Sequence, residues 1–100
     1  METDQLRTRI EALLAMSELE SAVEVFELMR ELHPDQFSEL FGIVKTRLSD
    51  FTRTRVLINF LMASYRFSSE DRTAFLEAVR TRLLDLLPEE RVTSILSTLA

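Results

Sequence analysis

The sequence predicts an all-α fold: a compact antiparallel bundle of five or six short helices, forming a single helical domain over residues 1–100. Apolar residues recur every three or four positions, and no stretch alternates apolar and polar residues as a half-buried strand does. Residues that favour helix starts stand between these apolar stretches, so only short linkers separate successive helices. Hydrophobic residues make up 46% of the chain and charged residues 29%, which is the composition of a chain that buries a core.

The first two helices are delimited by residues that favour helix starts and stops. Thr3 is expected to cap the first helix, which ends near Met16. Ser17 and Glu20 have the spacing of a capping box, in which each side chain binds the other residue's backbone N–H, and Pro34 ends the second helix. The second helix is expected to pack on more than one side, because its apolar residues cover a wide arc: Leu19, Ala22, Val23, Val25, Phe26, Leu28, Met29 and Leu32.

The third and fourth helices are predicted in the same way. Pro34 begins the third helix, because proline suits the first turn of a helix but cannot continue the preceding one. Gly42 in the middle of this helix either weakens it or allows a neighbouring element to approach closely. Ser49 and Asp50 offer the next cap. In residues 51–67 almost every side of the helix is apolar, which predicts a central fourth helix.

Two more helices complete the expected bundle. Ser68 caps the fifth, and Pro88 starts a short sixth helix. The short linkers make successive helices fold back on one another, as an antiparallel bundle or as stacked helical hairpins. Residues 19–29 resemble the second helix of a tetratricopeptide or pentatricopeptide repeat, which implies stacked hairpins. The pattern does not recur after the ~34 residues that separate such repeats, so the chain is not assigned to that family.

The residue inventory argues against an enzyme and against a metal or cofactor site. The chain has no cysteine, one histidine (His33) and one glycine, so thiolate nucleophiles, the usual zinc ligand sets and glycine-rich phosphate loops are absent. No catalytic, metal-binding or cofactor-binding residue is therefore predicted. The acidic start of the chain lacks the pattern of a secretory signal, and the longest apolar run, residues 56–63, is too short for a bilayer. These features predict a cytoplasmic protein with no membrane partner.

Charge is unevenly distributed along the chain, whose net charge is −5. Residues 1–40 hold ten acids and three bases, whereas residues 41–82 hold four acids and eight bases. An acidic stripe on the second helix, either a solvated face or a surface for a basic partner, consists of Glu20, Glu24, Glu27 and Glu31. A basic cluster near the start of the fourth helix consists of Lys45, Arg47, Arg53 and Arg55. The basic middle either neutralises the acidic helix, within one molecule or across a dimer, or contacts phosphate groups.

Together these observations predict a non-enzymatic protein-interaction module: an adaptor, regulator or assembly factor. Its partner is another protein or a second copy of the chain. Any apolar part of the fourth helix that stays exposed is the expected binding surface, with Val56, Phe60 and Tyr65 as candidates. The alternative is a nucleic-acid-associated regulator that uses the basic cluster, although the acidic net charge argues against it.

Overall fold

Helices form the regular structure in the computed structural model, which describes residues 1–99. The six α-helices are α1 (Thr3–Leu13), α2 (Glu18–Glu31), α3 (Phe37–Thr46), α4 (Thr54–Ala63), α5 (Ser69–Leu86) and α6 (Glu89–Leu99). Three short 3₁₀ turns lie between them: η1 (Pro34–Gln36), η2 (Leu48–Asp50) and η3 (Ser64–Arg66). No strand occurs among these residues, so the all-α prediction is confirmed.

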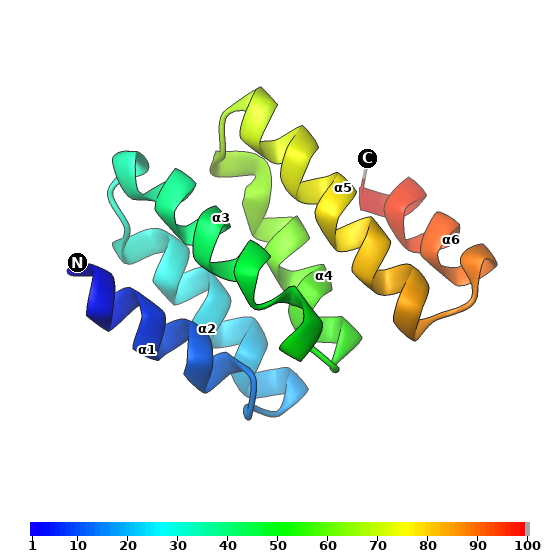
Figure 1. Ribbon diagram of the computed structural model, residues 1–100, viewed down its shortest axis with the longest axis horizontal. Coiled ribbons are helices and arrows are strands. Elements are labelled where there is room, and N and C mark those ends of the chain that lie inside the picture. Colours follow the sequence, from blue (N-terminus) through cyan, green and yellow to red (C-terminus); the bar gives the residue numbers. More distant parts are fainter. Residues whose placement is uncertain (100) are drawn as a thin grey trace.

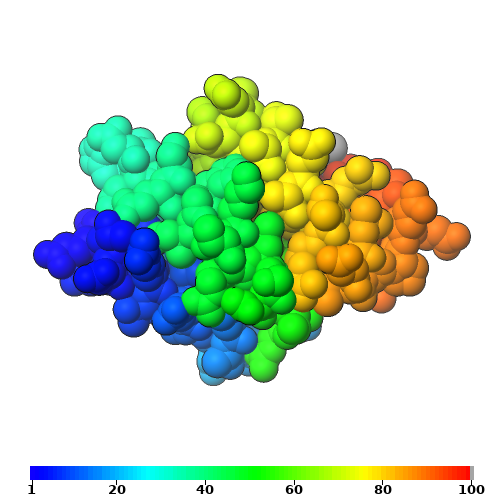
Figure 2. All heavy atoms as spheres, in the orientation of Figure 1, coloured from blue at the N-terminus to red at the C-terminus, as the bar shows by residue number. Residues whose placement is uncertain are grey.

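The helices form three hairpins that stack side by side (Figure 1). Helices α1, α3 and α5 lie nearer the viewer and run in one direction, while α2 and α4 lie behind them and run in the opposite direction. Helix α2 packs against α4, α4 against α5, and α6 against α5. Figure 2 shows the face that the side chains of α1, α3 and α5 cover. The stacked-hairpin form of the predicted bundle is therefore the one observed.

The serine caps predicted from the sequence hold two of these helices at their starts. The Ser17 hydroxyl oxygen accepts a hydrogen bond from the backbone N–H of Glu20 (3.3 Å), and that of Ser68 accepts one from Asp71 (3.2 Å). The reciprocal bond expected from the Glu20 carboxylate is not among the hydrogen bonds of residues 1–99, so the predicted capping box is half formed. The Thr3 prediction is wrong by one residue, because Glu2 occupies the cap position of α1.

The third and fourth helices are shorter than predicted. Pro34 starts the turn η1, and α3 itself begins three residues later. Ser49 and Asp50 lie in η2 and do not cap α4, which starts at Thr54. The reason is Phe51: its side chain is buried, and its backbone is extended (φ −78°, ψ 104°), so a helix cannot run through it. Burial of this ring thus sets the start of the central helix.

Helix α4 lies at the centre of the core, as predicted. Six of its ten residues are buried, and it packs against both α2 and α5. Val56 and Phe60 point into the core and are each 1% exposed. Four aromatic rings pack together in the core at centroid distances of 5.4 to 6.4 Å; they belong to Phe41, Phe60, Phe67 and Phe75.

Helix α2 packs against both α1 and α4, but part of its wide apolar surface stays exposed. Its buried apolar residues are Val25, Leu28 and Met29, followed by Leu32 just beyond the helix. On the opposite side, by contrast, Leu19 is 79% exposed, and Val23 and Phe26 are also exposed. The fold therefore leaves an apolar side of α2 without a partner within the chain.

Candidate interaction face

The exposed large apolar side chains gather on one part of the molecule. Seven such side chains are found among residues 1–99, and five of them lie on α2, α4 and η3. These five define what we call the outer face: Leu19, Val23, Phe26, Met62 and Tyr65. Of the other two, Met1 precedes α1 and Leu84 lies on α5. Because isolated exposed apolar residues are common but gathered ones are not, this concentration marks a candidate interaction surface.

Helical spacing explains how α2 contributes to the outer face. Leu19, Val23 and Phe26 stand at positions i, i+4 and i+7, which places them in one line along the helix. Leu28, in the middle of the buried side, lies nine positions after Leu19 and therefore about half a turn away from that line. Helix α2 thus carries two apolar sides, of which only one faces the core.

Two cavities extend the outer face across α4 to α6. At the C-terminal ends of α2 and α4, Phe26 and Tyr65 line a shared cavity of about 160 Å³. Met62 and Ile58 of α4 line a groove of about 300 Å³ with residues of α6, namely Ser94, Ile95, Thr98 and Leu99. The outer face is therefore a surface of three neighbouring helices.

Acidic residues border the outer face on the α1 side of α2. Arg9 of α1 binds two of them: its guanidinium lies 2.6 Å from the Glu24 carboxylate and also pairs with Glu31. Burial lowers the pKa of Arg9, but its hydrogen bonds to these two carboxylates outweigh burial and raise the pKa above its ordinary value. Glu20 and Glu27 are exposed and make no ion pair within residues 1–99. Two of the four acids of the stripe thus share one cation from α1, so within one molecule the stripe is not paired with the basic middle of the chain.

The structure does not bring the predicted basic cluster to one point. Arg47 is engaged by Glu11 at 2.6 Å and by Asp50 at 2.7 Å, and the hydrogen bond to Asp50 is the main reason that its pKa is raised. Arg53 and Arg55 are exposed and make no ion pair within residues 1–99. Lys45 is the fourth member of the cluster, and its ammonium lies 5.9 Å from the centroid of the Phe41 ring on the same helix.

Two of the three predicted apolar contact residues are not at the surface. Val56 and Phe60 are 1% exposed, so the expectation that they form a binding surface is wrong for the folded chain. They sit on the side of α4 that faces the core, where burial of their apolar surface stabilises the fold. Tyr65, at 68% exposure, does belong to the outer face.

Sequence reasoning missed the exposure of Leu19, Val23 and Phe26. Each side of α2 carries apolar residues at helical spacing, so the pattern alone does not tell which side faces the core. The buried side even includes a polar residue, Ser21, whose hydroxyl donates to the carbonyl of Glu18 (2.9 Å). The presence of two opposed apolar sides on α2 was itself a signal that one of them stays exposed, because a chain of this length has too few other helices to cover both.

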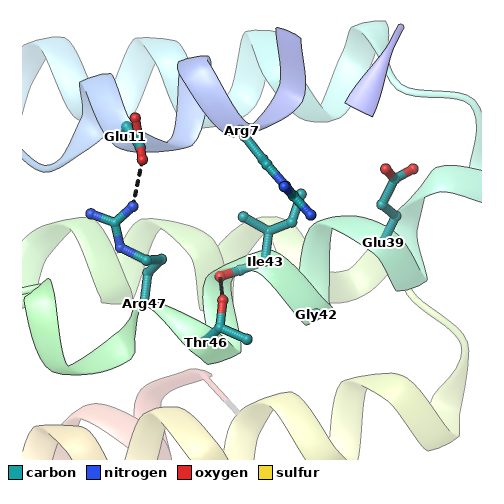
Figure 3. Close-up of a pocket in the computed structure, with 7 residues that line it drawn as sticks. All are labelled: Arg7, Glu11, Glu39, Gly42, Ile43, Thr46 and Arg47. Atoms are coloured by element: carbon teal, nitrogen blue, oxygen red, sulfur yellow. Dashed lines mark hydrogen bonds and ion pairs between the residues drawn. The ribbon is translucent and has the colours of Figure 1, made fainter. Parts of the chain in front are cut away.

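An open cavity of about 440 Å³ lies between α1 and α3 (Figure 3). Arg7 extends from α1 across it toward α3, and the Glu11–Arg47 ion pair closes one end. At the other end the Glu39 carboxylate accepts a hydrogen bond from the hydroxyl of Thr3 (2.5 Å). Two arginines and two glutamates leave the lining of this cavity without net formal charge.

Gly42 lies on this cavity in the middle of α3. A methyl group added there meets no atom within 4 Å, so of the two predicted roles for this glycine, close approach of a neighbour within the chain is wrong. The remaining effect of the glycine is to weaken the helix, because its backbone loses more conformational freedom on folding than that of alanine.

The substitution Gly42→Ala is therefore expected to raise the free energy of unfolding by about 0.5–1 kcal/mol. Urea denaturation followed by circular dichroism measures the change. Gly42→Val is the matched variant, and it should stabilise less because a β-branched side chain loses rotamer freedom in a helix. A lower stability of the alanine variant would contradict the open surroundings of this position.

Residues 1–99 contain no group of three histidine, aspartate or glutamate side chains placed to hold a metal ion. His33 is 71% exposed, with Nδ1 3.3 Å from a carboxylate oxygen of Asp35. None of the helices in this range has the length and apolar character needed to cross a membrane.

Comparisons with known proteins leave the outer face as the main guide to function. No family model matches the chain, and neither a curated protein nor a solved structure matches it.

Proposed function

We propose that this chain is a cytoplasmic, non-enzymatic interaction module that binds a protein partner through the outer face. The observation that carries the proposal is that five of the seven exposed large apolar side chains found in residues 1–99 share this one surface. Covering them would remove apolar area from water, which is the main source of affinity in protein association. An adaptor, regulator or assembly factor needs such a surface.

The residue types on the outer face also suit an interface. Tyr65 presents a mostly apolar ring with a hydroxyl that can bind a polar group of the partner, and tyrosine is enriched among residues that dominate binding energy. Met62 is flexible and adapts to the shape of the partner surface. Arg30 and Arg66 line the cavity beside Tyr65, where they would form the polar rim that surrounds the apolar centre of an interface.

A binding experiment with a matched control tests the proposal. The tagged chain is immobilised and exposed to source lysate, and the retained proteins are quantified by mass spectrometry. The double variant Leu19→Glu/Val23→Glu should reduce specific retention at least about tenfold, because carboxylates replace apolar contacts at the interface. Leu84→Glu, which changes an exposed apolar residue on α5, should retain the same proteins as the unmodified chain.

Circular dichroism establishes that all variants keep their helical content. If the double variant and the Leu84 variant retain the same proteins in the same amounts, the outer face is not the binding surface and the proposal fails.

A nucleic acid partner is the second candidate, because Arg53 and Arg55 are exposed and unpaired in the described residues. The candidate is weakened by Arg47, whose charge two carboxylates already neutralise. Treating the lysate with nuclease separates the two functions. Retention that disappears after nuclease, that Arg53→Glu abolishes and that falls steeply with salt would favour the nucleic-acid function.

A further inference from the structure

The α2 part of the outer face has acids along one of its edges. Glu20 and Glu27 each follow a residue of the exposed apolar line, Leu19 and Phe26, by one position, which places them about 100° further around the helix. The two glutamates stand seven positions apart and therefore point the same way. Both are exposed, and neither forms an ion pair within residues 1–99. A partner that covers the apolar line must therefore also approach these two carboxylates.

An open hollow on α2 joins the apolar line to the acidic stripe. It has a volume of about 410 Å³, and the residues of the described chain that line it are Met16, Leu19, Glu20, Val23 and Glu24. Three of them are apolar, two are acids and none is a cation. A lysine or arginine side chain suits such a hollow, because its apolar stem covers Leu19 and Val23 while its charged end stays beside the carboxylates.

The cations of the surrounding elements do not neutralise this surface. Helix α2 carries five glutamates and a single arginine, Arg30, which stands after the apolar line. On α1, Arg9 pairs with two of the glutamates, whereas Arg7 lines the cavity toward α3. On α4, Arg55 lines the groove toward α6, and Arg53 is exposed at the cap without an ion pair in residues 1–99. If the cations at positions 9, 30 and 53 are all counted, the five acids still exceed them by two.

The exposed apolar line also has the spacing of a surface that packs against a helix. The buried side of α2, which packs against α1 and α4, carries Val25, Leu28 and Leu32 at positions i, i+3 and i+7. The exposed line has the equivalent spacing of i, i+4 and i+7. Rows of side chains with this spacing fit between those of a neighbouring helix. The exposed side of α2 is thus suited to one more helix, which the described part of the chain does not supply.

We propose that this part of the outer face binds a basic amphipathic helix of another protein. The apolar side chains of that helix cover Leu19, Val23 and Phe26, and lysine or arginine side chains along one of its edges pair with Glu20 and Glu27. Two cations seven positions apart match the two glutamates, because all α-helices rise by the same distance per residue. Apolar contacts supply most of the affinity, and the charges select the partner and speed its association. This inference rests on the proposed function, because it specifies the partner of the same surface.

A selection among helical peptides tests the charge of the partner. The library consists of displayed peptides of about 20 residues, with leucine at helical spacing and an equal mixture of lysine and glutamate at the positions that flank the leucines. Peptides retained by the immobilised chain should carry lysine at least about tenfold more often than glutamate at these flanking positions. The dissociation constant of a selected peptide is then measured by fluorescence anisotropy.

Two double variants of the chain locate the binding surface. Glu20→Lys/Glu27→Lys should raise the dissociation constant of a selected basic peptide at least about tenfold, because like charges then meet across the interface. The matched control is Glu70→Lys/Glu77→Lys on α5. It also reverses two exposed glutamates seven positions apart, neither in an ion pair within residues 1–99 and the first of them in the first turn of its helix. The control changes the net charge equally and should alter the dissociation constant less than about twofold.

Circular dichroism verifies the fold of each variant, and Glu27→Lys alone replaces the first double variant if that variant unfolds. A library from which no peptide is retained, or in which lysine is not preferred, would overturn the inference. So would a selected peptide whose binding the two double variants weaken equally, because the attraction would then follow net charge and not this surface.

The failures of the two proposals are distinguishable. If Leu19→Glu/Val23→Glu abolishes the capture of a lysate protein but the peptide selection shows no preference for lysine, the outer face binds a partner of different chemistry and only this inference falls. If that variant leaves lysate capture unchanged, the proposed function falls, and the inference falls with it.

Discussion

Replacing Phe75 with alanine is expected to lower the free energy of unfolding by about 3–5 kcal/mol. Phe75 lies on α5, is 1% exposed and contacts the rings of three other phenylalanines, at centroid distances of 5.4, 6.4 and 5.5 Å from Phe41, Phe60 and Phe67. The substitution removes the buried ring together with these aromatic contacts, and it leaves a cavity between α3, α4 and η3 that the rigid helices cannot fill.

Urea denaturation followed by circular dichroism measures the loss. Phe26→Ala is the matched control, because Phe26 is the same residue type on the outer face at 36% exposure. Its removal should cost less than that of Phe75, at most about 2 kcal/mol in the monomer, because part of the ring is already in contact with water. Equal losses at the two positions would contradict the assignment of Phe75 to the centre of the core. A domain of this size has about 5–15 kcal/mol in total, so the Phe75 variant is expected to be marginally folded.

The second large effect is expected at Arg82, whose replacement by alanine should cost about 2–3 kcal/mol. Its side chain is 18% exposed and lies on α5. It donates to the carbonyl of Phe51 through Nε (3.2 Å) and to that of Ser49 through Nη2 (3.0 Å). It thereby ties the turn η2 to α5, and its loss would leave two carbonyl groups at the edge of the core without these charged donors.

Two comparisons isolate this role. Arg80→Ala removes an exposed arginine from the same helix and should change stability by less than about 0.5 kcal/mol. Hydrogen exchange should accelerate at the amide of Phe51, which donates to the carbonyl of Leu48 in η2, before it accelerates in the helices. If the Arg80 and Arg82 variants lose the same stability, anchoring of η2 is not the function of Arg82.

The features predicted correctly from the sequence are those that depend on nearby residues. The caps at Ser17 and Ser68 need only a hydroxyl and the backbone three positions later, so their spacing was sufficient. The anchoring by Arg82 was not predictable, because its acceptors lie more than thirty positions away in the chain. The same holds for Phe51, whose burial is decided by α4 and α5 and interrupts a stretch that reads as helix.

The candidate site shows the same division. Val56, Phe60 and Tyr65 were predicted together, as apolar residues of the fourth helix that could stay exposed. Hydropathy does not separate them, whereas the fold does: Val56 and Phe60 stand on the buried side of α4, and Tyr65 lies beyond its end in η3 and is exposed. Ion pairs were equally hard to anticipate. The cation that pairs with the acids of α2 is Arg9, which belongs to α1, the other helix of the first hairpin.

The stacking of the hairpins also determines how quickly this chain is expected to reach its native state. Each helix packs against helices that adjoin it in the chain or are one further along, so most native contacts join residues that are close in sequence. Little loop entropy is lost before such contacts form, and chains of this kind fold within about microseconds to milliseconds. Short-lived unfolded chains expose the apolar side chains of α2 and α4 only briefly, which limits their aggregation during synthesis.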